Sequence, residues 1–135
     1  MTAEISIHDN FLLSYTVDAG EKRITLHTAY YDREPHEFTD VLFTGVLAYH
    51  FEGDDLRTVL FDIEQTSFQH IYKNHQDLFE HRKNYGWPLS SYNTVEELMQ
   101  TLTDLNIQAF EISSACGLDG FVLAQEMQIL PHRTR

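Results

Sequence analysis

Residues 108–130, which read QAFEISSACGLDGFVLAQEMQIL, decide the fold class of this chain. Strand-like segments at 108–115 and 121–130 flank the connection Gly117-Leu118-Asp119-Gly120. Two glycines in a four-residue connection are a strong turn signal between strands. The stretch therefore predicts a β-hairpin, which returns the chain to a sheet whatever precedes it.

The chain begins with a second predicted hairpin. Residues 11–17 and 23–31 alternate apolar and polar side chains with the period of two that strands require. Residues 18–21, with Gly20, supply the turn between them. The alternation places one set of apolar side chains on a common face: Phe11, Leu13, Tyr15 and Val17.

Two more strands are predicted before residue 65. Residues 38–51 are rich in β-branched and aromatic side chains, and Gly45 within them is typical of a bulge or a close crossing. Residues 57–64 resume the alternation after a second turn at 52–55. We expect the first four strands to form an antiparallel meander.

The period then changes to that of helices. Apolar residues recur at spacings of three and four from Phe68 to Phe79, after Thr66 or Ser67 as a cap, and Gly86 ends this helix. Thr94 and Glu97 form a capping box before a second apolar stripe. The order is ββββααββ. It predicts an α+β fold in which an antiparallel sheet of about six strands has two helices packed on one face.

Composition limits the classes of partner. The 135 residues fit one domain, residues 1–135, with 42% hydrophobic side chains to fill a core. The formal net charge of −12 opposes binding to nucleic acid or to anionic membranes. A single cysteine forms no disulfide within the chain, and no apolar run is long enough to span a membrane. Because Met1-Thr2-Ala3-Glu4 lacks the features of a secretory signal, we expect a cytoplasmic protein.

No motif in the sequence supplies a recognisable catalytic set. Phosphate-binding loops and the G-x-S-x-G elbow are absent, and the spacing of the eight histidines does not favour a metal site, so we expect no cofactor and no metal. His27 and His50 would approach each other if their strands were neighbours in register. Glu111 is expected to point into solvent, although a buried Glu111 would be a candidate site.

Acidic residues concentrate in two segments, at 32–40 and 52–64, which we expect to adjoin in the sheet. Only such clustering would give a field strong enough to steer a partner. The Tyr85-Gly86-Trp87-Pro88 segment adds aromatic side chains, of which Trp87 is expected to fill the core or to anchor a partner. The candidate binding residues are Asp54, Asp55, Asp62, Glu64, Tyr85 and Trp87.

Four runs resemble a small uncharacterised bacterial domain family over most of the chain. They are Ala48-Tyr49-His50-Phe51, Leu60-Phe61-Asp62-Ile63-Glu64, Tyr85-Gly86-Trp87-Pro88, and Phe110-Glu111-Ile112-Ser113-Ser114 continuing through Leu118-Asp119-Gly120-Phe121. In size, acidity and α+β pattern the chain is also similar to immunity proteins of bacterial polymorphic toxin systems. The likeness to immunity proteins implies inhibition of a toxin, and neither resemblance implies roles for particular residues.

These observations favour a non-enzymatic acidic protein-binding module, in particular an immunity-type inhibitor of a basic toxin. The alternative is a small hydrolase or ligand-binding protein with a pocket near Glu111, His50 or His27. A third interpretation is a homodimer in which exposed strand edges pair.

Overall fold

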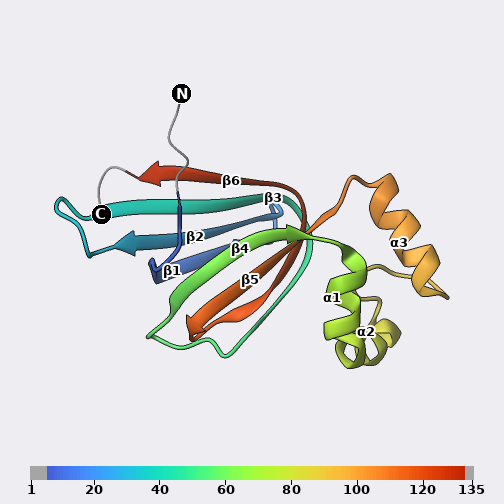
Figure 1. Ribbon diagram of the computed structural model, residues 1–135. Helices are drawn as coiled ribbons and strands as arrows, with labels where there is room; N and C mark the ends of the chain where they lie inside the picture. Colours follow the sequence, from blue (N-terminus) through green and yellow to red (C-terminus); the bar gives the residue numbers. More distant parts are fainter. Residues whose placement is uncertain (1–5, 133–135) are drawn as a thin grey trace.

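The structure, a computed structural model, describes residues 6–132. Within this range six antiparallel strands close into a barrel in the order β1-β2-β3-β6-β5-β4, and three α-helices lie between β4 and β5 in the chain (Figure 1). The α+β class and the six antiparallel strands are confirmed. The elements are β1 Phe11–Asp18, β2 Arg23–Tyr30, β3 Glu37–Glu52, β4 Val59–Thr66, α1 Phe68–Asn74, α2 Gln76–Arg82, the 3₁₀ turn η1 Lys83–Tyr85, α3 Val95–Asp104, β5 Gln108–Cys116 and β6 Asp119–His132.

The predicted hairpin at the end of the chain is confirmed. β5 and β6 pair antiparallel, with Ile112 opposite Gly120 and Gln108 opposite Ala124. Gly117 in the turn has a φ of +95°, a conformation that L side chains rarely adopt. This hairpin is the centre of the fold because β6 also pairs along β3, while β5 pairs with β4.

The expected four-stranded meander is wrong for its last strand. β1, β2 and β3 are consecutive neighbours, but β4 pairs with β5 and with the start of β1, and the far edge of β3 is taken by β6. β3 is 16 residues long and offers β6 a ladder that runs from Phe38 to Glu52. β4 therefore leaves β3 and closes the barrel.

The expected face of β1 is also wrong. Phe11 and Leu13 are exposed, whereas Leu12 and Tyr15 pack with the barrel interior. The cause is a β-bulge between Leu12 and Ser14 in the pairing with β2, which moves the inward side chains by one position. A second register shift, between Val46 and Ala48, agrees with the bulge predicted near Gly45.

The first predicted helix is two helices. His75, with φ −129° and ψ 30°, ends α1 and begins α2, so that the helix count is three and not two. The predicted ends are confirmed where capping residues mark them. Ser67 accepts from the amide of His70, Thr94 accepts from the amide of Glu97, and Gly86 takes the left-handed conformation after η1.

Two apolar layers hold the molecule together. Alternate side chains of β6 serve both, because Val122 and Ala124 point into the barrel while Phe121 and Leu123 point outwards. The outward layer packs under the helices, with Ile71, Phe79 and Leu98 as its buried helical members. The helices therefore cover the outer face of part of a closed barrel, at the right in Figure 1, and not one face of an open sheet.

No helix within residues 6–132 is long and apolar enough to cross a membrane. The segment Met1-Thr2-Ala3-Glu4, on which the expected lack of a secretory signal rests, lies outside the described residues.

Candidate binding pocket at the barrel seam

The barrel closes through a very short ladder between β1 and β4. Its one residue pair is Phe11 with Val59, flanked by hydrogen bonds from the amide of Leu12 to the carbonyl of Thr58 and from the amide of Leu60 to the carbonyl of Asn10. Beyond Leu12, β1 separates from the segment that leads into β4. We call this line the seam.

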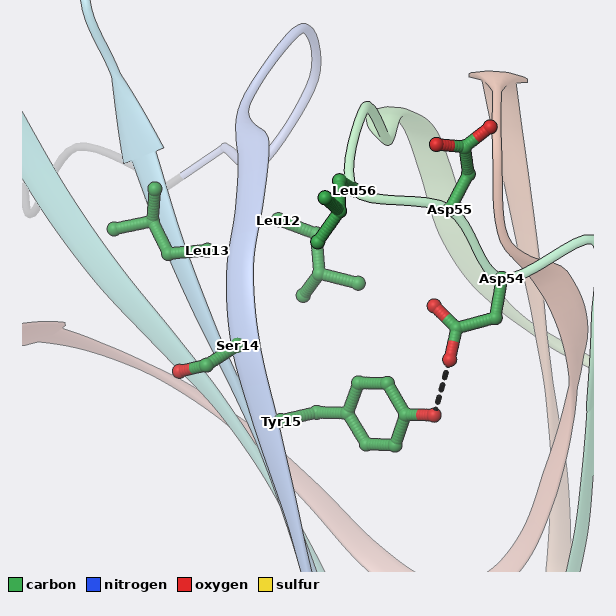
Figure 2. Close-up of a pocket in the computed structure, with 7 residues that line it drawn as sticks. All are labelled: Leu12, Leu13, Ser14, Tyr15, Asp54, Asp55 and Leu56. Atoms are coloured by element: carbon green, nitrogen blue, oxygen red, sulfur yellow. Dashed lines mark hydrogen bonds between the residues drawn. The ribbon is translucent and has the colours of Figure 1, made fainter.

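A pocket of about 470 Å³ opens at the seam (Figure 2). β1 forms one wall, and the loop between β3 and β4 forms the other. The lining combines apolar side chains with two adjacent carboxylates, and Leu56 is fully exposed at the rim. The lining residues are Leu12, Leu13, Ser14, Tyr15, Asp54, Asp55 and Leu56.

Tyr15 bridges the pocket. Its hydroxyl donates to Asp54 Oδ2 at 2.5 Å, and its ring packs edge-on against Phe51 at a centroid distance of 5.3 Å. The hydrogen bond to Asp54 is the main cause that raises the pKa of Tyr15 to about 12, with smaller contributions from burial and from the charge of Asp54. Tyr15 therefore stays a neutral hydrogen-bond donor across the physiological range.

The titration of Tyr15 gives a direct test of this bridge. We expect Asp54→Asn to return the pKa of Tyr15 from about 12 towards the ordinary value of 10.0. Because the folded pKa is raised, the bridge stabilises the fold fully below pH 10 and loses this effect as the pH rises towards 12. NMR of ring-labelled tyrosine, with Tyr15→Phe to assign the signal, measures the shift. An unchanged Tyr15 pKa in the variant would contradict the bridge.

The other two predicted acidic residues lie on a different surface. Asp62 and Glu64 are on β4, where Glu64 is paired with Glu111 of β5 across the ladder. A hydrogen bond with Asp62 raises the pKa of Glu64, and the negative charges of Asp62 and Glu111 add to the rise. Like charges face each other here, and His70 Nε2 lies 3.2 Å from the carboxylate of Glu111.

The expectation that the two acidic segments adjoin is wrong. Residues 31–36 precede β3 and residues 53–58 follow it, so the loops lie at opposite ends of a 16-residue strand. β3 pairs with β2 and β6, whereas β4 pairs with β1 and β5, so two strands separate β3 from β4 on either side of the barrel. Asp40, near the first end, is held by His27 and His132, each with Nδ1 3.0 Å from one of its oxygens. The two acidic segments are therefore not neighbours in the sheet.

Tyr85 and Trp87 lie in the helical part of the chain. Tyr85 is 80% exposed on η1, and Trp87 is half-buried against Phe79 at a centroid distance of 5.0 Å. Arg82 stacks over the indole at 5.4 Å. Trp87 thus fills the apolar layer between helices and barrel. Among residues 6–132, neither Tyr85 nor Trp87 lines the pocket at the seam.

A second hollow, of about 510 Å³, lies where the end of β3 meets α1 and α2. His50 and His75 line it with ring centroids 5.9 Å apart, and His50 Nε2 is 3.3 Å from Glu52. Burial is the largest influence on His75 and lowers its pKa, against an opposite effect of Glu52. Among residues 6–132, no group of three or more His, Cys, Asp or Glu is arranged to hold a metal ion.

The strands of His27 and His50 are neighbours, but not in the register that would bring the two histidines together. His27 pairs with Asp40 of β3, ten residues before His50 on the same strand. Glu111 points outwards from the barrel as expected, but it is half-buried and paired with His70 of α1, and not free in solvent. His50 and Glu111 therefore flank the helical part of the molecule, while His27 belongs to another region.

The sequence indicated the carboxylates of the pocket at the seam but not the β1 side of the pocket. Leu56 carried a weak signal, because it is an apolar residue within an acidic turn. Leu13 and Tyr15 carried none, since they were expected to face the core and Tyr15 lies 39 residues from its partner Asp54. Comparisons with protein-family models, curated proteins and solved structures gave no match.

Proposed function

We propose that this protein is a non-enzymatic binding module for a basic protein partner. The observation that carries the proposal is the pair Asp54 and Asp55 beside an apolar hollow, with Leu56 fully exposed at the rim. A lysine or arginine side chain is apolar along its stem and cationic at its end, and both parts would find complementary surface here. The net charge of −12 would speed the approach of such a partner.

Within this class we propose an immunity-type inhibitor of a basic toxin. The support is the size and acidity of the chain and its resemblance to such proteins. The mechanism would be occlusion, in which the acidic pocket covers a basic surface that the toxin needs for its activity. A gene for a basic toxin directly upstream, and a complex of the two purified proteins, would support this assignment.

Binding to cationic peptides tests the general proposal. The probe is a panel of labelled ten-residue peptides with arginine or lysine at every second position and varied apolar residues between. We expect Asp54→Asn with Asp55→Asn to weaken the best binder by about tenfold, because charge-assisted contacts are lost. Fluorescence anisotropy at low and physiological salt measures the affinity.

A matched variant separates a site from a general charge effect. Glu96→Gln with Asp104→Asn removes the same charge from exposed positions of α3, in the helical part of the chain. We expect it to change the affinity by less than about twofold, since α3 lies across the molecule from β1 (Figure 1) and contributes no residue to the pocket. Equal weakening by both double variants, or a panel without any binder, would overturn the proposal.

A second candidate is a small hydrolase or ligand-binding protein that uses the hollow at His50 and His75. The specific observation is the lowered pKa of His75, which keeps an imidazole neutral next to Glu52. Hydrolysis of ester or phosphate substrates that is lost in His75→Gln would favour this candidate over the binding module.

A further inference from the structure

The seam leaves a strand edge of β1 open. In the described part of the chain, backbone hydrogen bonds from residues 9–12 to 58–60 hold the start of β1 against β4, and none joins 13–18 to 53–57. On its other side β1 pairs with β2 through to Asp18. Residues 13–18 therefore form an ordered strand with one unoccupied edge, which is the template that an added strand needs.

The facing loop is held in place by its own hydrogen bonds. Asp55 Oδ1 accepts from the amide of Arg57, and the hydroxyl of Thr58 donates to the carbonyl of Asp55. Tyr15 joins this loop to β1 through Asp54. The gap between β1 and the loop is thus a defined space of about 470 Å³ with walls fixed on both sides.

We propose that an extended basic segment of a partner protein binds at this seam as an added strand along residues 13–18 of β1. Its backbone would pair with the open edge of β1, its cationic side chains would reach Asp54 and Asp55, and its apolar side chains would cover Leu56. This inference rests on the proposed function and adds the mode of binding and the backbone conformation of the bound segment.

The charge of the pocket selects this occupant over a second copy of the chain. A copy that docked its own β1 here would bring another Asp54 and Asp55 to the same place, with a further net charge of −12. Like charges brought together at an interface oppose association. A segment with alternating basic and apolar side chains matches both the carboxylates and the exposed Leu56 of the pocket (Figure 2).

Backbone methylation of the peptide tests the mode of binding separately from its charge. Successive amides of a strand point to opposite edges, so methyl groups on every second amide block one edge only. Two methylated forms of the best-binding peptide, one for each edge, keep all charges and side chains. We expect one form to lose affinity by about tenfold or more and the other to bind within about twofold of the parent.

Hydrogen exchange locates the contact. We expect the parent peptide to slow the exchange of the β1 amides that face the seam, and the blocked form to leave them unchanged. If both methylated forms bind as well as the parent while Asp54→Asn with Asp55→Asn still weakens binding, the added strand is overturned and the proposed function stands. If no peptide binds, both fail. A dimer in light scattering, together with β1 amides that exchange slowly without any peptide, would overturn the choice of partner.

Discussion

Replacing Phe121 with alanine is expected to lower the free energy of unfolding by about 4 kcal/mol. Phe121 is fully buried on the outer face of β6, where it contacts residues of β3 and of the helical segment. Its ring stacks on Phe79 at 5.8 Å and lies 4.9 Å from the ring of His75. Trp87 and His50 complete the surroundings. The substitution removes the side chain that the helices share with the barrel.

Chemical denaturation followed by tryptophan fluorescence measures this effect directly. Trp87 is the one tryptophan of the sequence, and it lies 6.3 Å from the ring of Phe121, so its emission reports on the same layer. The matched control is Phe61→Ala, because Phe61 is 52% exposed on β4 and its loss is expected to cost less than about 1 kcal/mol. Similar losses in the two variants would contradict the central position of Phe121.

Replacing Gly120 with alanine is expected to cost about 3 kcal/mol. Gly120 lies on β6 opposite Phe51 of β3 and Ile112 of β5. An added Cβ would overlap with the carbonyl oxygen of His50 and would lie 3.0 Å from the Cα of Phe51. Both are backbone groups of the longest ladder, so the strands themselves must move apart to admit a methyl group.

Gly20→Ala is the control for this substitution. At Gly20 a Cβ would meet only the side chain of Asp18, at an ordinary 3.5 Å. We expect this variant to match the parent or to gain up to about 1 kcal/mol through the unfolded state. Thermal denaturation of both variants measures the difference. A Gly120→Ala protein as stable as Gly20→Ala would show that β3 and β6 are not closely apposed at this point.

Local structure was predicted correctly where it depends on residues that act over a short range in the chain. The turn at Gly117, the caps at Ser67 and Thr94, and the end at Gly86 were all predicted, because each acts within a few residues of its own position. The break at His75 was not, since neither glycine nor proline marks it and the apolar spacing continues through it.

Strand pairing was predicted correctly where strands that follow each other in the chain pair, as β1 with β2, β2 with β3, and β5 with β6. β4 instead finds its partners in β5 and in the start of β1, which are distant in the chain. The bulge at Leu13 in the pairing of β1 with β2 leaves no trace in the alternation of β1. The candidate pocket shows the same division. Its acidic wall, Asp54 and Asp55, was predicted from composition, but the β1 wall exists only because the barrel closes.

Because the ladder between β1 and β4 has one residue pair and a few flanking hydrogen bonds, the seam is the shortest strand pairing of the barrel. Loss of the pairing between β1 and β4 would leave the other five strand pairings of the described chain intact. The barrel would become an open, curved sheet with a gap between β1 and β4. Leu12 and Leu60, which are buried in the closed barrel, would then be exposed to solvent at this gap. A partner strand bound beside Leu13 would extend the backbone pairing along the seam. Binding of the partner would therefore also stabilise the closed barrel.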